Sequence, residues 1–328
     1  MKNGFLTAAA VLMATGLVII WGALLVSRFN ISVPVFDFNM HALVSDSDDA
    51  KTQSSLLDSE FNNLEIEAEG ADITIAQYNG ADVKVESSYG KNNRLSTEIK
   101  NGTMKITASR GRRRNGFLSL FSKSFSVKVY LPSKAYKNMT IVTTEGDIRI
   151  GKGLTVSSSD ITTRTGDVRF AASVDGLLRI KTTTGDIRLD GVKAEKTEIK
   201  VTTGDIVIDG LKCAGEVSAA VITGDVRTTD MICGSFDTSG TTGDVRLTDT
   251  VAAGSFDIKR TTGDVRFENC DAGEITVRTS TGDVNGTLRT GKSFITHTSI
   301  GSVSVPESSD GGKCEITTSI GDIEIRLK

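Results

Sequence analysis

Proline, tryptophan and histidine are scarce in this chain of 328 residues, which holds 3, 1 and 2 of them respectively. Glycine is abundant at 33 residues, and many glycines beside few prolines suit a turn-rich β-protein better than a helical one. The 38 lysines and arginines are balanced by 41 aspartates and glutamates, which leaves a formal charge of −3. Because no basic field covers the chain as a whole, we expect no nucleic-acid partner.

Cysteine and histidine are arranged in a way that argues against zinc and against catalysis. The four cysteines form no Cys-x-x-Cys pair, and the two histidines, His41 and His297, have no matching nucleophile or set of metal ligands. We therefore expect no enzyme, no metal and no cofactor, with a polysaccharide-cleaving β-helix as the weaker alternative. Cys213 and Cys233 lie one repeat apart, so stacking would place their Cα atoms about 5 Å apart, which allows either a disulfide or two buried thiols.

The chain opens with an apolar segment. Residues 5–26 carry no charge and are long enough to cross a bilayer of about 30 Å as a helix. We predict an uncleaved anchor over residues 1–27 in a bacterial cell membrane, with the N-terminus in the cytoplasm and the rest of the chain outside it. A cleaved signal peptide is the alternative. Residues 28–59 are acidic and polar, which predicts a tether.

The dominant feature of the sequence is a glycine that recurs ten times, at intervals of 19 or 20 residues, with Gly301 as the ninth. So regular a period indicates one short supersecondary unit stacked on copies of itself. In the other nine repeats an aspartate follows directly. The predicted turn pairs are Gly146 and Asp147, Gly166 and Asp167, Gly185 and Asp186, Gly204 and Asp205, Gly224 and Asp225, Gly243 and Asp244, Gly263 and Asp264, Gly282 and Asp283, and Gly321 and Asp322.

Apolar residues alternate on both sides of each glycine, which predicts a half-buried strand on either side of a tight turn. A repeat of this length leaves no room for a crossover helix. We therefore predict an all-β fold, a parallel β-solenoid of about ten coils over residues 139–328, right-handed by default. Residues 60–138 repeat less regularly, which predicts irregular first coils or a cap of the solenoid. The C-terminal coil has no such cap, so an open edge there could add a partner's strand.

An arginine follows two residues after the aspartate in six repeats. Side chains at positions i and i+2 of a strand share one face, so these arginines form an outward row. Two interpretations stay open: a structural ladder of Asp–Arg pairs, or a row of guanidinium groups that binds anionic polymers. The row consists of Arg149, Arg169, Arg188, Arg227, Arg246 and Arg266.

A second basic cluster interrupts the pattern between residues 110 and 123. Four arginines are followed there by aromatic and aliphatic side chains. Such a segment could contact an anionic membrane surface or a partner, or could be a hairpin loop whose apolar half folds back on the cap. The candidate residues are Arg110, Arg112, Arg113, Arg114, Phe117 and Phe121.

The strand sequences EAEGADITIA and SVKVYLP, together with the TTGDVRL-type repeats, resemble the DUF4097 family of bacterial β-strand-repeat proteins. The resemblance covers residues 56–328. It implies an adhesin-like protein of the cell envelope, similar to LiaG and YvlB proteins and linked to envelope stress, and it transfers no catalytic residue. We expect a membrane-anchored envelope scaffold or interaction module that binds a cell-wall or surface polymer or a membrane protein. A self-assembling, bactofilin-like solenoid is the alternative.

Overall fold

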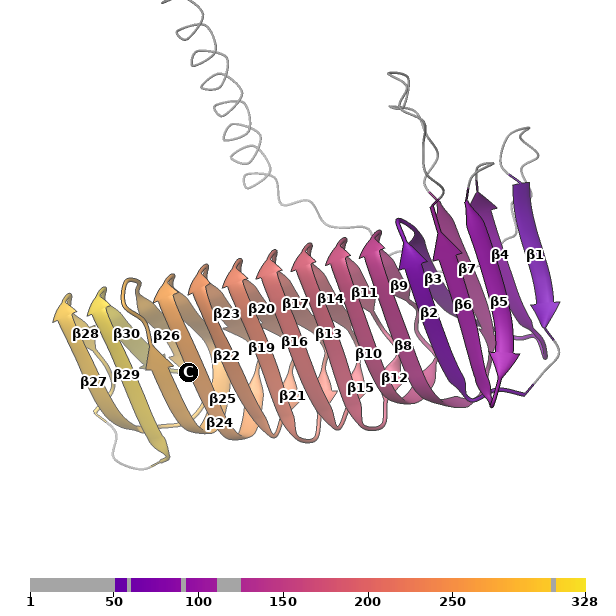
Figure 1. The fold of residues 1–328 in the computed structure, drawn as a ribbon. Helices are drawn as coiled ribbons and strands as arrows, with labels where there is room; N and C mark the ends of the chain where they lie inside the picture. Colours follow the sequence, from indigo (N-terminus) through magenta and orange to yellow (C-terminus); the bar gives the residue numbers. More distant parts are fainter. Residues whose placement is uncertain (1–50, 58–59, 90–92, 111–124, 308–310) are drawn as a thin grey trace, which may run out of the picture. The chain divides into compact units, whose positions relative to one another are not determined.

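The computed structural model describes residues 51–57, 60–89, 93–110, 125–307 and 311–328. All regular structure in these ranges is β-strand (Figure 1), and none of it is a helix long and apolar enough to span a membrane. The predicted anchor lies outside the described residues. So do Arg112, Arg113, Arg114, Phe117 and Phe121 of the predicted contact loop.

Thirty strands form two sheets, which we call sheet A and sheet B. Sheet A contains β1 (Lys51–Leu57), β3 (Asp72–Tyr78), β4 (Val83–Tyr89), β7 (Ser126–Pro132), β9 (Ile148–Ile150), β11 (Val168–Phe170), β14 (Ile187–Asp190), β17 (Ile206–Asp209), β20 (Val226–Thr229), β23 (Val245–Thr248), β26 (Val284–Leu288), β28 (Val303–Ser304) and β30 (Ile323–Leu327). Sheet B contains β2 (Asn63–Glu69), β5 (Arg94–Lys100), β6 (Thr103–Ser109), β8 (Ala135–Glu145), β10 (Thr155–Thr165), β12 (Ser173–Val174), β13 (Leu177–Thr184), β15 (Lys193–Ala194), β16 (Lys196–Thr203), β18 (Lys212–Cys213), β19 (Glu216–Thr223), β21 (Ile232–Cys233), β22 (Ser235–Thr242), β24 (Val251–Thr262), β27 (Ser293–Ile300) and β29 (Lys313–Ile320). The long strand β25 (Val265–Arg278) begins in sheet A and ends in sheet B.

Each regular coil runs along sheet B, turns at a corner glycine, and returns along a shorter strand of sheet A. Neighbouring coils pair in parallel and in register, so that Val168 lies between Ile148 and Ile187. The predicted all-β class and parallel β-solenoid are therefore confirmed for the described residues. The solenoid makes about nine turns, the number of full periods that ten corner glycines enclose.

A continuous apolar core fills the space between the two sheets, from Phe61 near the first strands to Ile325 in the last. In the internal coils the second residue after a corner glycine points into this core, as Val226, Val245 and Val265 do with at most 1% of their surface exposed. Burying such a side chain contributes roughly 1.5–3 kcal/mol. Stacking of like residues in successive coils therefore supplies the energy that one coil alone could not provide.

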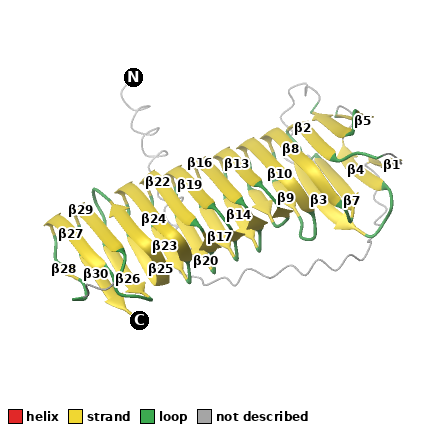
Figure 2. Cartoon of the chain, turned by 90° about the horizontal axis from the view of Figure 1, so that it is seen from below, coloured by secondary structure: helices red, strands yellow, loops and turns green. Residues whose placement is uncertain are grey.

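At both ends of the solenoid the order of the coils in space differs from their order in the sequence (Figures 1 and 2). At the N-terminal end β2 lies between β6 and β8, and β3 lies between β7 and β9. At the C-terminal end β29 lies between β25 and β27, and β30 lies between β26 and β28. The outermost coil there is the penultimate one in sequence.

Two expectations need correction here. We placed an open edge at the last coil of the chain, but that coil is paired on both sides and the edge strands are β27 and β28. The predicted tether over residues 28–59 also contains a strand, because β1 pairs antiparallel with β4. With β5 antiparallel to β6, the N-terminal coils carry antiparallel strands in both sheets.

Candidate binding surface at the glycine corner

The corner glycines bring the backbones of successive coils into direct contact. Their φ angles lie between 123° and 150°, a region that favours glycine. A Cβ atom on Gly224 would lie within 3.0 Å of the carbonyl oxygen of Gly204 in the preceding coil, closer than real Cβ atoms come. Both the φ angle and the close approach therefore require glycine at this corner.

The aspartates of the turn pairs form a hydrogen-bonded ladder along this corner. The Oδ1 atom of Asp205 accepts the backbone N–H of Asp225 at 2.8 Å, and Asp225 accepts the N–H of Asp244 at 2.8 Å. The same contact continues from Asp72, which accepts the N–H of Asp147, to the C-terminal coils. Each carboxylate thus satisfies a backbone donor that the tight turn would otherwise leave to solvent. Sequence reasoning assigned these aspartates to turns and to arginine pairing and missed this role.

The ladder ends at the outermost coil. Asp322 accepts both the backbone N–H and the hydroxyl of Ser302, at 2.7 and 2.9 Å, and these bonds lower the pKa of its carboxyl below the usual value. Ser302 is the residue after Gly301, the only corner glycine not followed by aspartate. Among the described residues no further coil pairs with this one, so no backbone N–H calls for a carboxylate at position 302.

The arginine row lies beside the ladder on the outer face of sheet A. Arg149 pairs with Asp147 at 2.7 Å, Arg188 pairs with Asp209 at 3.1 Å, and Arg227 pairs with both Asp225 and Asp205. Burial would lower the pKa of Arg227, but its neighbouring carboxylates outweigh burial and raise it. Within the described residues, the remaining three arginines of the row have no ion-pair or hydrogen-bond partner; these are Arg169, Arg246 and Arg266.

A shallow groove of about 200 Å³ opens where two of these unpaired arginines stand in adjacent coils. It is lined by Asp225, Arg227, Asp244, Arg246, Asp264 and Arg266, with Val245 and Asn285. The three carboxylates each accept a backbone N–H from the next coil. Arg246 and Arg266 are exposed, so their guanidinium groups are available to an anionic ligand.

Comparison with known proteins identifies the family. The profile of the family Toastrack DUF4097 matches residues 61–231 and 215–328. The chain belongs to the Toastrack DUF4097 family. This confirms the resemblance seen in the strand and repeat sequences.

Several solved structures are similar to this Toastrack chain, at low sequence identity. A proposed adhesin from Bacteroides fragilis is 11% identical, with a TM-score of 0.43, covering 85% of this chain and 98% of that one. A proposed adhesin from Parabacteroides distasonis is 14% identical, with a TM-score of 0.42 and coverages of 84% and 98%. A proposed lipid binding protein from the same species is 16% identical, with a TM-score of 0.35 and coverages of 85% and 98%. No curated protein matches the sequence.

A buried arginine, Arg260, lies between the sheets close to the groove. Arg260 is 4% exposed and donates to the carbonyl of Val221 at 3.4 Å and to the hydroxyl of Thr238 at 3.3 Å. Its guanidinium occupies the space that a Cβ on Gly240 would fill, and its Nε has no partner among the described residues. Burial lowers the pKa of Arg260 to about 10, although Asp225 and Asp244 act in the opposite direction. Sequence reasoning missed this residue. The signal was a charge three positions before a corner glycine, where most repeats have threonine or valine.

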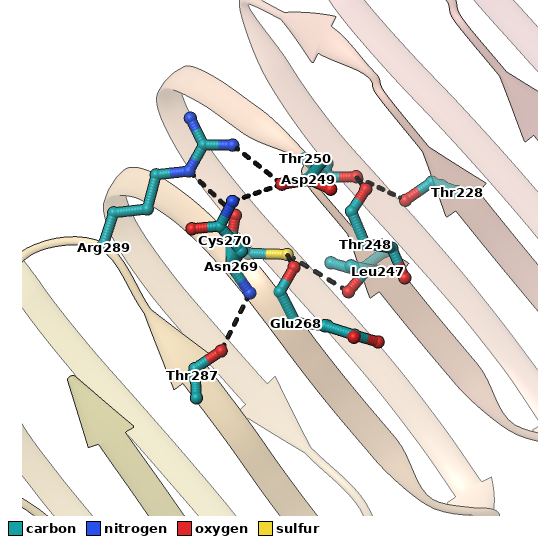
Figure 3. A network of polar contacts seen from close by, with 10 residues as sticks. All are labelled: Thr228, Leu247, Thr248, Asp249, Thr250, Glu268, Asn269, Cys270, Thr287 and Arg289. Carbon is teal, nitrogen blue, oxygen red and sulfur yellow. Dashed lines mark hydrogen bonds and ion pairs between the residues drawn. The ribbon is translucent and has the colours of Figure 1, made fainter. Parts of the chain in front are cut away.

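The second turn of the five central coils, at the other end of the sheet A strands, is built differently. Its left-handed residues are Gly191, Gly210, Asp230, Asp249 and Asn269, with φ between 47° and 64°. Figure 3 shows the polar network there: the Asn269 side-chain amide donates to Asp249, and Arg289 donates to the Asn269 carbonyl at 2.8 Å and to Asp249 at 3.4 Å. These polar groups bond to one another along the solenoid.

All four cysteines are buried and free, so the disulfide between Cys213 and Cys233 is not formed. Both lie at the ends of parallel strands in adjacent coils. The Sγ of Cys213 instead donates to the carbonyl of Glu195 at 3.3 Å. Burial raises the pKa of Cys233 to about 12, which keeps it a neutral thiol.

The other residues singled out in the sequence do not converge on a site. Arg110 is exposed just after β6, and His297 is exposed on β27, whereas His41 lies outside the described residues. Among the residues that the structure describes, no group of three or more histidines, cysteines, aspartates and glutamates could hold a metal ion.

Proposed function

We propose that this protein is a membrane-anchored interaction module of the bacterial cell envelope that binds anionic wall or surface polymers without catalysis. Residues 5–26 anchor it with the N-terminus in the cytoplasm, and the solenoid lies outside. The observation that carries the proposal is the pair of exposed, unpaired guanidinium groups of Arg246 and Arg266 in one groove.

The chemistry of the groove favours a repeating anion. Arginine binds phosphate and carboxylate groups through two parallel N–H donors, and successive coils repeat this donor about every 4.8 Å. An exposed ion pair contributes at most about 1 kcal/mol, so a single contact is weak. A polymer that contacts several arginines at once gains affinity through effective concentration. Beyond Val207, which interrupts the row between Arg188 and Arg227, Arg169 offers one further unpaired guanidinium group.

Substitution of the two unpaired arginines tests this proposal. The double variant Arg246→Ala/Arg266→Ala of the full chain should bind isolated wall fragments about tenfold more weakly, since two exposed contacts are lost. Wild-type binding should also weaken as salt rises. The matched control is Lys181→Ala/Lys200→Ala, which removes two exposed cations from sheet B and touches no groove residue. Equal loss in both double variants, or no loss in either, would contradict the proposal.

We place the same module in the envelope stress response, where a polymer-binding solenoid would respond to changes in the wall. Deletion of its gene should raise sensitivity to wall-active antibiotics, and the Arg246→Ala/Arg266→Ala variant should fail to restore wild-type sensitivity. If that variant fully restored wild-type antibiotic sensitivity, the stress role would not depend on polymer binding through these arginines.

A further inference from the structure

The outermost C-terminal coil leaves two strand edges unpaired. Among the described residues β27 pairs only with β29, and β28 pairs only with β30. Apolar side chains gather at this end: Ile295 is 54% exposed, Ile300 66% and Val303 45%. Phe294 and Val305 are only partly buried, so the cross-section of the core is open there.

This edge lacks the usual protection against pairing. Soluble proteins guard edge strands with charged side chains, especially lysine. The run from Ser293 to Val305 carries no lysine, arginine, aspartate or glutamate. At the N-terminal end, by contrast, β5 is antiparallel to its neighbour and carries Arg94, Glu98 and Lys100. The two ends therefore differ in strand direction and in charge.

The aspartate ladder excludes one way of covering the edge. In every internal coil, the corner aspartate accepts the N–H of the next parallel coil. A parallel coil added at this end would need position 302 to accept its N–H, but Ser302 offers no carboxylate there, and the N-terminal end of another copy presents the antiparallel edge strand β5 in place of a parallel coil. Continued parallel stacking into a filament is therefore disfavoured at this end.

We propose that a second copy of this chain covers the edge, in an end-to-end dimer about a two-fold axis perpendicular to the sheets. In this arrangement β27 pairs antiparallel with β27 of the partner, and β28 with β28. Stacked sheets stand about 10 Å apart, and a second solenoid end presents two edge strands at that same spacing. A lone peptide strand would cover one edge and leave the core cross-section open.

Charge and symmetry fit the same partner. Because the edge carries no formal charge, self-pairing places no like charges opposite each other. The two-fold axis sets the glycine corner of one copy on the side of the partner's second turn, so the aspartate ladder has no need to continue across the contact. An isologous contact of this kind closes at two subunits. Pro306 follows β28 and lacks an N–H donor, so β27 contributes the larger share of the pairing.

The test measures the mass of the full chain in detergent micelles by sedimentation equilibrium and light scattering. Wild-type protein should be a dimer. Ile295→Lys should raise the dimer dissociation constant at least about tenfold, because each copy then carries a lysine on the edge strand, the kind of charge that guards such strands against pairing. Val303→Lys should act in the same direction through sheet A. The matched control is Ile222→Lys, since Ile222 is 55% exposed on β19, within sheet B.

The control also accounts for any association through the apolar N-terminal segment, which all variants share. Unchanged thermal midpoints in the lysine variants would show that they fold. A wild-type monomer, a dimer equally stable in Ile295→Lys and Ile222→Lys, or species that grow with concentration beyond two copies would each overturn the proposal. The dimer should persist in Arg246→Ala/Arg266→Ala. Loss of the dimer can therefore be told apart from loss of polymer binding.

Discussion

The two turns of the five central coils differ in the residues that they accept, although both use positive φ angles. At the glycine corner, residue type does not vary, because a Cβ would overlap the backbone of the preceding coil, as at Gly224. At the second turn a Cβ on Gly191 would meet nothing within 4 Å, and later coils place Asp230 or Asn269 at the same position. Close backbone stacking demands glycine, whereas a left-handed φ alone also admits aspartate and asparagine.

The most direct test of this difference is to add one methyl group at each turn and compare the two losses of stability. Gly224→Ala should cost about 3 kcal/mol or more, because it adds backbone overlap to a φ of 143° that alanine avoids. Gly191→Ala should cost about 1 kcal/mol, from its φ of 63° alone. Gly191→Asn should be within about 0.5 kcal/mol of wild type. Urea midpoints of the full chain measure the difference, and equal losses for the two alanine variants would refute it.

The aspartate beside the corner glycine can be tested in the same way. Asp244→Ala removes the acceptor for the N–H of Asp264 and should cost about 1–2 kcal/mol. Asp244→Asn keeps a side-chain oxygen at that place and should lose less than half as much. The readout is the urea midpoint, with amide hydrogen exchange at Asp264 as a local measure. If the asparagine variant is as unstable as the alanine variant, charge rather than the hydrogen bond supports the ladder.

A third variant tests the buried cation next to the corner. Arg260→Met replaces a buried guanidinium, whose Nε has no partner among the described residues, with an apolar side chain, and Gly240 leaves room for it. Removing a buried charge that lacks a carboxylate partner is often neutral or stabilising, and here we expect a gain of about 1 kcal/mol. The thermal midpoint measures it. A large loss would show that the bonds of Arg260 to Val221 and Thr238 outweigh the cost of burying its charge.

Much of the fold could be predicted from the glycine period and the alternation around it, because a short repeat with period-two burial has few other ways to form a core. The coil order at the two ends could not. Near-identical repeats can stack in more than one order, and local pattern does not distinguish β29 from β27 as the neighbour of β25. Ser302 was the one sequence signal of this order. It takes the place of the aspartate that elsewhere bonds to the next coil, and its coil is the outermost one.

The candidate site was predictable in part for a similar reason. Spacing places the arginine row on one face, but which arginines lack partners depends on rotamers and on residues beyond the motif, such as Asp209, the partner of Arg188. Spacing also brought Cys213 and Cys233 into neighbouring coils. Stacking distance alone could not show that neither sulfur forms a disulfide.

The smallest expected effect concerns the end of the ladder. The two bonds from Ser302 lower the pKa of Asp322 in the folded state, so its contribution to stability is fully present above the unfolded pKa. That contribution is lost as pH falls through the lowered folded value. The thermal midpoint of wild type should therefore exceed that of Asp322→Asn at neutral pH, and the difference should shrink in acid. A constant gap between wild type and Asp322→Asn across the acid range would mean that the Ser302 contact does not depend on the charge of Asp322.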